Sequence, residues 1–403
     1  MAKKHHFNDF IPYGKQSIDD KDIDSVISVL KSDYLTQGPV LKRFEQAFCD
    51  FTGANFGVAV SNATAALHVA CLALGVSKGD SVWTSPNSFI ASANCARFCG
   101  ADVDFVDIDS NTYNLCSIKL EQKLLQAKLD GCLPKVVIPV HFAGHPCNMS
   151  RIYELSKIYH FSIIEDASHA VGAKYKDKPI GYCEFSDICI FSFHPVKIIT
   201  SGEGGLALTN SARLEKAMRS YACHGIERSS DDLIEQEQGD WYYEQQHLGF
   251  NYRMTELQAA LGLSQLEKVN SFVKKRHQLF EQYKYLLKDL DIHLPNLEND
   301  SYSSLHLYPI LLSERLTSEK KWIFSELRRQ GIGVQTHYIP IHTQPYYQAL
   351  GFAWGDFPQA ENYYQRSISL PMYSDLTLHE QTHVVNIFRE ILEQVKNELK
   401  GAI

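Results

Sequence analysis

The sequence predicts an α/β protein with a large, mostly parallel sheet and helices on both of its faces. Two observations predict this architecture. Between residues 57 and 165, short apolar runs rich in β-formers alternate with longer segments in which apolar residues recur at helical spacing. After about residue 250 this alternation ends and a long helical pattern begins. We therefore expect a large α/β domain over residues 1–250, with an N-terminal arm over 1–16, and a smaller α+β domain over residues 251–403.

The N-terminal elements follow from start and stop signals. Ser17 is the expected N-cap of an amphipathic helix that ends at Leu30, and Gly53 is expected to end a second helix over residues 40–51. The alternation that follows predicts strands over residues 57–60, 81–84, 102–106, 135–140 and 161–165, and helices over residues 63–74, 88–98, 118–129 and 150–159.

The later elements are less regular. Residues 173–181 predict a hairpin, residues 187–193 predict a strand that Pro195 ends, and residues 225–247 predict a polar, mobile loop. A helix over residues 256–290, weakly broken at Gly262, is expected to bridge the two domains. Beyond it we expect strands over residues 304–312 and 333–337, and helices over residues 318–330, 360–366 and 378–399.

Composition and charge exclude several classes of protein. The formal charge of −8 and the absence of Lys/Arg blocks argue against binding to nucleic acid or to an anionic membrane. No run approaches the roughly 18 apolar residues of a spanning helix, and no signal peptide is visible. The ten cysteines show no CxxC spacing, so we expect reduced thiols in a cytoplasmic protein, with no metal site and no disulfide framework.

Lys197 is the first candidate for chemistry. It follows the strand expected over residues 187–193, at the place where α/β sheets put residues that contact ligands. Phe191, Phe193 and Ile198 surround it in the sequence, and partial desolvation would lower its pKa and free the amine to attack a carbonyl. On this stretch alone, a surface lysine after a strand is an equally good interpretation.

Asp166 makes the chemical interpretation of Lys197 the better one. It ends another apolar strand, three residues before His169. Pyridoxal phosphate requires this pair of residue types, because a lysine forms the Schiff base and an aspartate keeps the pyridine nitrogen protonated. The two residues together therefore predict a pyridoxal phosphate site.

Four weaker signals have the order that such a site needs. Residues 61–64 follow a strand and open a helix, so their free N–H groups and the Thr64 hydroxyl suit a phosphate, although an ordinary N-cap is the better interpretation of this stretch alone. Ser192 would donate a hydrogen bond from its hydroxyl to that phosphate, or it is an ordinary serine of the strand. Phe89 would stack on a planar ring and His169 would bond a ring oxygen, or both are core residues. Together they favour a cofactor site.

The sequence resembles the DegT/DnrJ/StrS family of sugar aminotransferases from about Ile11 to its C-terminus. The motifs that carry the resemblance are LTQG (35–38), SNATAALH (61–68), EDASHA (165–170), SFHPVK (192–197) and GFNYRM (249–254). Within that family it is most similar to the pseudaminic acid branch, the UDP-4-amino-4,6-dideoxy-N-acetyl-β-L-altrosamine transaminases, through residues 306–312 and 331–338. The resemblance implies the fold type I architecture of aspartate aminotransferase.

The resemblance also implies roles for individual residues. Lys197 would bind the cofactor covalently and move protons, and Asp166 would pair with the ring nitrogen. His169 would lie near the ring hydroxyl and Phe89 would stack on the ring, while Asn251 would reach the phosphate of a neighbouring subunit in a homodimer with shared active sites. The phosphate would be held by Ala63, Thr64 and Ser192, and the nucleotide-sugar site would be lined by Tyr13, Asp33, Tyr34, Leu35, Thr36, Thr336, His337 and Tyr338.

The implied reaction transfers an amino group from L-glutamate to C4 of a UDP-linked 4-keto-6-deoxy-N-acetylhexosamine. The alternatives are C3 or C4 amination of another nucleotide-linked keto sugar, and a non-catalytic regulator that binds the cofactor. A sugar dehydratase of this family would carry histidine in place of Lys197, and a nicotinamide site lacks its GxGxxG motif. This sequence departs from the family at three positions. Many relatives have glutamine at the position of His169 and tryptophan at the position of Phe89, and the asparagine that usually follows the lysine is Ile198 here.

Overall fold

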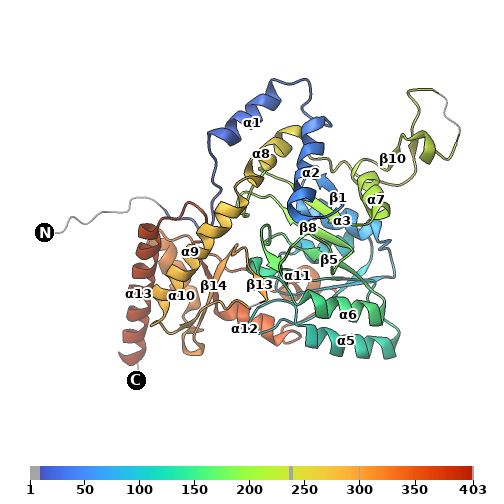
Figure 1. Ribbon diagram of the computed structural model, residues 1–403. Coiled ribbons are helices and arrows are strands. Elements are labelled where there is room, and N and C mark those ends of the chain that lie inside the picture. Colours follow the sequence, from blue (N-terminus) through green and yellow to red (C-terminus); the bar gives the residue numbers. More distant parts are fainter. Residues whose placement is uncertain (1–9, 236–238, 299, 402–403) are drawn as a thin grey trace.

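The computed structural model describes residues 10–235, 239–298 and 300–401. Within them, the core is a seven-stranded sheet with the order β1-β9-β8-β5-β4-β2-β3. Figure 1 labels β1, β8 and β5 of this sheet. Neighbouring strands are parallel except for β9, which is antiparallel to both β1 and β8. The mostly parallel sheet expected from the sequence is thus confirmed. Its strands are β1 (Phe56–Val60), β2 (Ser81–Thr84), β3 (Asp102–Phe105), β4 (Val136–Ile138), β5 (Ser162–Asp166), β8 (Ile188–Ser192) and β9 (Gly205–Thr209).

Helices cover both faces of this sheet, because its inner strands bury apolar side chains in both directions. Val69 and Met218 pack against Ile190 on one face, and Phe48 and Leu155 lie in the core of the other face. The first face is covered by α3 (Ala63–Ala73), α4 (Ala91–Phe98) and α7 (Ala212–Ala222), and the second by α2 (Pro39–Thr52), α5 (Ser117–Asp130) and α6 (Met149–Tyr159).

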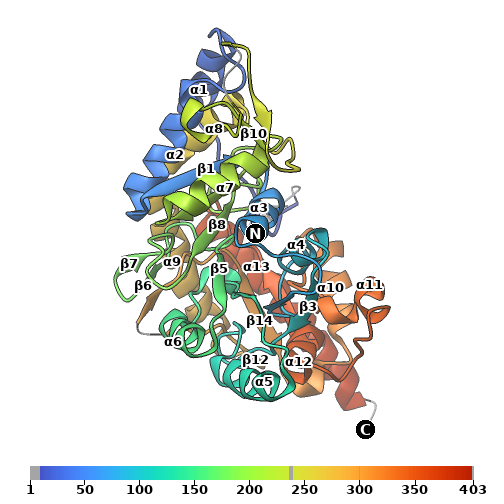
Figure 2. The same ribbon diagram turned by 90° about the vertical axis from the view of Figure 1, so that its right-hand side faces the viewer.

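At one end of the molecule, α1 (Asp20–Leu30) and α2 pack against α8 (Glu256–Leu266) (Figures 1 and 2). Two buried carboxylates hold this group together. Asp22 accepts a hydrogen bond from Ser264 Oγ at 2.6 Å, and Glu256 accepts the N–H groups of the first turn of α2. Buried carboxylates need such partners, so the two acids tie segments that are distant in sequence.

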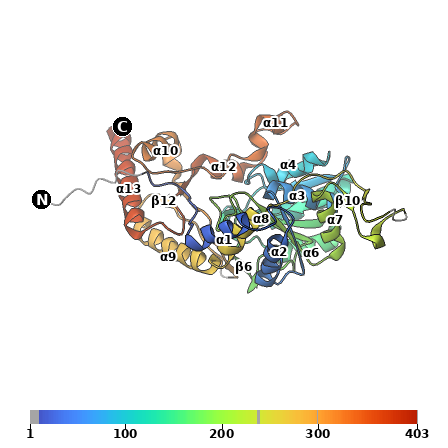
Figure 3. The ribbon, with the colours of Figure 1, turned by 90° about the horizontal axis from the view of Figure 1, so that it is seen from above.

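The C-terminal part has its own apolar core beside the large sheet (Figure 3). Tyr308 and Ile323 belong to this core together with Phe388. Ile11 also lies there and pairs with Ile332, so the end of the N-terminal arm packs on the C-terminal part. Its elements are α9 (Val269–Leu287), β12 (Ile292–His293), β14 (Tyr308–Leu312), α10 (Lys320–Arg329), α11 (Pro345–Gln348), α12 (Pro358–Arg366), β15 (Ser367–Leu370) and α13 (Leu378–Gly401).

Short elements complete the described chain. The expected hairpin over residues 173–181 is present, and it pairs with a third short strand. In the part of the chain that is described, no helix combines the length and the apolar character needed to cross a membrane. The short elements are β6 (Lys174–Tyr175), β7 (Lys178–Pro179), β10 (Ile226–Glu227), β11 (Glu244–Gln245), β13 (Ser301–Tyr302) and the 3-10 turns η1 (Phe142–Gly144), η2 (Ser230–Asp232), η3 (Glu314–Leu316) and η4 (Ile341–Thr343).

Two helix predictions are wrong in detail. Asp19, not Ser17, caps α1, because Asp19 and Asp22 each accept the other's N–H in a capping box. The helix expected over residues 256–290 is two helices, α8 and α9, which meet after Leu266 and not at Gly262. Gly262 instead leaves room for Phe44, since a Cβ at this position would lie 2.6 Å from the Phe44 ring.

Two further predictions need correction, and one strand of the large sheet and one helix on its face lie outside the predictions. Residues 333–337 form no strand, because their ladder is limited to a single bridge between Gln335 and Ser369. The loop expected over residues 225–247 contains the short β10–β11 ladder, and its residues 236–238 lie outside the described residues, as do residues 1–9 of the arm. Neither β9 nor α7 is among the predicted elements, since glycines interrupt the apolar pattern just before them.

Candidate active site

The ends of three strands meet at one edge of the large sheet. Val60 at the end of β1 pairs with Gly205, which pairs in turn with Ser192 at the end of β8. Asp166 ends β5, the next strand. This register places Ser192 and Asp166 near the turn that follows Val60, at the carboxyl edge where α/β sheets bind ligands.

The turn after Val60 has free backbone donors at the start of a helix. Asn62 caps α3 by accepting the Ala65 N–H at 2.8 Å. Among the described residues, the N–H groups of Ala63 and Thr64 have no hydrogen-bond acceptor, so both point from the helix N-terminus without a partner. Gly205 permits this packing, because a Cβ there would collide with the carbonyl of Asn62. A phosphate suits two free N–H groups at the positive end of a helix.

Asp166 is held rigidly in a buried position. Only 5% of its surface is exposed. Its carboxylate accepts the Ser92 hydroxyl at 2.6 Å and the Ser168 N–H at 3.1 Å, and Ser92 is itself hydrogen-bonded to Ser88. Sequence reasoning missed Ser92, since a serine in the first turn of a helix carries no local signal of such a contact.

Lys197 lies in the turn after β8, near Asp166. Burial lowers the pKa of the Lys197 amine to about 8, and the Asp166 carboxylate opposes part of this shift. A minor fraction of the amine is therefore unprotonated at pH 7, which is far more than for a lysine of ordinary pKa. The next residue, Ile198, is buried in the apolar core on one face of the sheet, which accounts for an apolar side chain at that position.

A group of aromatic side chains lies beside Lys197. This aromatic group consists of Tyr13, Phe89, His169, His337 and Tyr338. His169 Nε2 is hydrogen-bonded to the Tyr338 hydroxyl at 3.0 Å, and the Phe89 ring lies 6.2 Å from the Tyr338 ring. The His337 ring lies 5.3 Å from the ring of Tyr13. Burial lowers the pKa of His169 well below its ordinary value and that of His337 to about 3, so both rings are neutral at pH 7.

The other candidates contact different partners within one chain. Asn251 is exposed and pairs with Cys223. Thr36 is also exposed and pairs with Thr255, while the half-buried Thr336 bonds the carbonyl of Ser367. Three more expected substrate residues, Asp33, Tyr34 and Leu35, are likewise exposed.

The residues at the sheet edge fit pyridoxal phosphate. The site offers an amine of lowered pKa, a buried carboxylate and an anion-binding helix N-terminus. In addition, His169 Nδ1 is buried and has no hydrogen-bond partner in the part of the chain that the structure describes. An unpaired buried nitrogen is costly, and a ligand oxygen would satisfy it.

The profile of the DegT/DnrJ/EryC1/StrS aminotransferase family matches residues 16–389. The chain belongs to this family. Aminotransferases of the DegT/DnrJ/EryC1/StrS family depend on pyridoxal phosphate, and the cofactor prediction is therefore confirmed.

Individual relatives are similar over nearly their whole length. The chain is 36% identical over 397 residues to the UDP-4-amino-4,6-dideoxy-N-acetyl-β-L-altrosamine transaminase of Campylobacter jejuni, covering 97% of this chain and 100% of that protein. It is 35% identical over 397 residues to the spore coat polysaccharide biosynthesis protein SpsC of Bacillus subtilis, covering 98% and 99%. The structure of Helicobacter pylori PseC, an aminotransferase involved in the biosynthesis of pseudoaminic acid, superimposes with a TM-score of 0.86 at 32% identity, covering 96% and 100%.

Proposed function

We propose that this aminotransferase moves the amino group of L-glutamate to C4 of a UDP-linked 4-keto-6-deoxy-N-acetylhexosamine, a step of pseudaminic acid biosynthesis. The observation that carries the proposal is the lowered pKa of Lys197 beside the buried carboxylate of Asp166. The names of the Campylobacter and Helicobacter relatives support the choice of sugar. The ten free cysteines suit a cytoplasmic site of action.

Each residue at the sheet edge has one task in this proposal. Bound pyridoxal phosphate supplies a carrier for the amino group and a sink for the electrons of the reacting carbon. Asp166 keeps the ring nitrogen protonated, and His169 offers Nδ1 to the ring hydroxyl. Phe89 covers one face of the ring. The phosphate is bound by Ala63, Thr64 and Ser192.

Lys197 is the group that moves protons. Because its pKa is lowered to about 8, its amine and ammonium forms are both populated between pH 7 and 9. It can therefore take a proton from the donor carbon and return it. His169 and His337 stay neutral over this range, so Lys197 is the one of these three side chains that changes its charge.

The sugar nucleotide binds beside the aromatic group. Tyr338 bonds His169 on the cofactor side of the site, and His337 packs against Tyr13, another residue of the proposed nucleotide-sugar site. Remote binding of UDP can orient the ketone, so a free sugar should react poorly. The rest of the proposed nucleotide-sugar site consists of Asp33, Tyr34, Leu35, Thr36 and Thr336.

We propose a homodimer with shared active sites. Asn251 and Thr36 are exposed in one chain and make few contacts there. A second copy that placed Asn251 at the phosphate would add a side-chain amide to the free N–H groups of Ala63 and Thr64.

Asn251→Asp should weaken binding of the cofactor, because it places a carboxylate beside the phosphate. Equilibrium dialysis of pyridoxal phosphate measures this loss. Asn55→Asp is the matched control, since Asn55 is an exposed asparagine before the start of β1.

Mixing Asn251→Asp and Lys197→Ala subunits tests whether sites are shared. Random exchange should restore about a quarter of wild-type activity, because half of the dimers are mixed and each has one intact site. If subunits exchange and activity stays at the level of the separate variants, each chain builds its site alone.

The substrate is tested by offering two 4-keto-6-deoxy sugars derived from UDP-N-acetylglucosamine, one epimerised at C5 and one not. We expect amination at C4 of the epimerised sugar, identified by NMR of the product. Preference for the non-epimerised ketone would move the enzyme to a sister pathway. Amination at C3, or activity on a dTDP sugar alone, would contradict the proposed sugar and leave the cofactor chemistry standing.

A further inference from the structure

The chain between β13 and β14 enters the fold directly behind His169. Ser304 donates its hydroxyl to the His169 carbonyl at 2.7 Å and its N–H to the Gly144 carbonyl at 3.1 Å. Two residues later, His306 donates its N–H to the Ala143 carbonyl at 2.9 Å. Gly144 has a φ of +88°, and a Cβ there would collide with Ser304. Residues 304–306 are thus fixed to two places, the His169 carbonyl and the η1 turn over residues 142–144.

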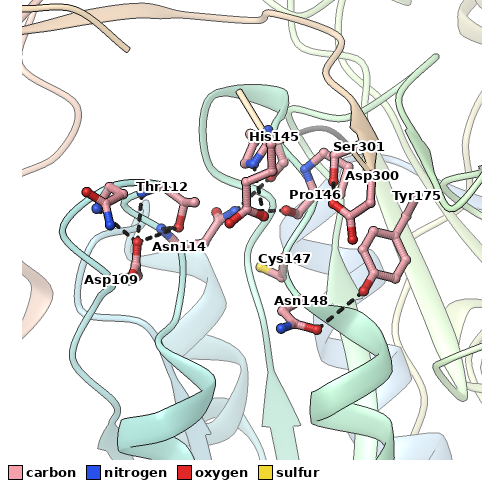
Figure 4. A network of polar contacts seen from close by, with 12 residues as sticks. Asp109, Thr112, Asn114, His145, Pro146, Cys147, Asn148, Tyr175, Asp300 and Ser301 are labelled. Carbon is pink, nitrogen blue, oxygen red and sulfur yellow. Dashed lines mark hydrogen bonds and ion pairs between the residues drawn. The ribbon is translucent and has the colours of Figure 1, made fainter. Parts of the chain in front are cut away.

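The loop that receives this segment is held from its other side. Asn114 donates to the carbonyls of His145 and Pro146 at 3.0 and 3.1 Å, and it accepts the Phe142 N–H at 2.8 Å (Figure 4). Because Asn114 restrains the loop over residues 142–146, this loop gives residues 304–306 a fixed attachment, and the position of His306 is well defined.

The His306 ring packs against His169. The two ring centroids lie 4.4 Å apart, and Tyr338 stacks on His169 at 6.0 Å with an interplanar angle of 20°. His306 is 3% exposed. Within the described residues, Nδ1 of His306 and Nδ1 of His169 are both buried without a hydrogen bond. The Phe142 ring also lies 6.3 Å from His169, edge to face. The plane of His169 is therefore set by three ring contacts and by the hydrogen bond from Tyr338, and His306 makes the shortest of the ring contacts.

Arg276 holds the His306 backbone in place. It is 1% exposed and donates to the carbonyls of Leu305, His306 and Met372 at 3.2, 3.1 and 2.9 Å. These acceptors are neutral, and burial lowers the pKa of Arg276 to about 10. A guanidinium that is buried without a carboxylate partner lowers stability. We therefore interpret its three hydrogen bonds as fixing the backbone around His306. One of them fixes Leu305, whose φ of +52° is rare for leucine.

We propose that His306 is a positioning residue for His169, and that Arg276 holds His306 in place. The inference rests on the proposed function only in placing His169 beside the cofactor ring. The His306 ring excludes water from one face of His169 and restricts its rotation. With that ring absent, water reaches His169 and its imidazole protonates more readily.

The test is an NMR titration of the imidazole nitrogens of His169 in the cofactor-free, full-length protein. The charged and titratable groups that face His169 are Lys197, His337, Tyr338 and His306. His306→Ala should raise the pKa of His169 by about one unit or more, toward its ordinary value. His306→Phe should restore the wild-type titration, because it returns a ring to the same place. A merely structural role for His306 would not separate these two variants.

His277→Ala is the matched control. His277 is half-buried beside Arg276, but its ring stacks on Tyr302 and its Nε2 bonds the Ser303 carbonyl. It therefore touches the same segment without touching His169, and the His169 titration should not change. A shift in this variant equal to that of His306→Ala would overturn the inference, since loosening the segment would then suffice.

Affinity for pyridoxal phosphate is the second measurement. We expect His306→Ala to bind the cofactor several-fold more weakly and His306→Phe to bind it nearly as wild type. If His306→Ala does not fold, His306→Asn provides the same comparison, because it also removes the ring. An unchanged His169 titration in the folded variant would overturn the inference, even if the enzyme aminates the proposed sugar. Failure of the sugar assay would leave the cofactor-free titration untouched.

Discussion

Replacing Lys197 with alanine is expected to abolish aminotransfer while leaving noncovalent binding of pyridoxal phosphate. The variant loses the amine that bonds the cofactor and carries the proton, and removal of such a group costs about 10⁴-fold in rate or more. It keeps Asp166 and the N-terminus of α3, so ring and phosphate contacts persist. Turnover with glutamate measures the first effect, and equilibrium dialysis measures the second.

Lys320→Met is the matched control for this variant. Burial lowers the pKa of Lys320 to about 8 as well, but this lysine starts α10 and bonds the carbonyl of Tyr364. Its replacement should leave turnover near the wild-type rate, which separates the effect of position from that of a lowered pKa. Near wild-type turnover in Lys197→Ala would show that the site is assigned to the wrong lysine.

The lowered pKa of Lys197 also predicts a dependence on pH. The amine is largely protonated below about pH 8 and largely free above it. Covalent capture of the cofactor by the wild-type protein should therefore slow as the pH falls through 8, followed by absorbance. Capture that slows only below pH 6 would assign the titration to another group.

The parts of this site that the sequence predicted are those with a local signal. Asp166 and Ser192 end apolar strands, and Ala63 opens a helix after one, so the pattern of a parallel sheet places all three at one edge. The pairing of Val60 with Gly205 and of Gly205 with Ser192 then provides the register.

The parts that the sequence did not predict depend on contacts between distant segments. Ser92 meets Asp166 only because α4, which packs on β2 and β3, brings its first turn to the end of β5, and Arg276 meets Met372 only in the folded C-terminal part. The cap of α1 was missed for a related reason. Ser17 is a good N-cap by type, but only Asp19 has a partner three residues on that completes both bonds.

Asp166→Asn is expected to leave folding nearly intact and to weaken catalysis severely. The amide oxygen can still accept the Ser168 N–H, and the Ser92 hydroxyl can rotate to accept from the new NH₂ group, so no buried polar atom loses its partner. What disappears is the negative charge. A neutral amide cannot keep the ring nitrogen of the cofactor protonated, and loss of one such electrostatic partner costs about 10²–10³-fold in rate.

The test of Asp166→Asn combines thermal unfolding with single-turnover kinetics on glutamate. Asp109→Asn is the matched control, because its carboxylate also accepts backbone N–H groups, from Asn111 and Thr112, that an amide oxygen can still accept (Figure 4). Both variants should unfold close to the wild-type temperature, and only Asp166→Asn should lose its single-turnover rate. A normal rate in that variant would make Asp166 a structural carboxylate, since its hydrogen bonds survive the substitution and only its charge does not.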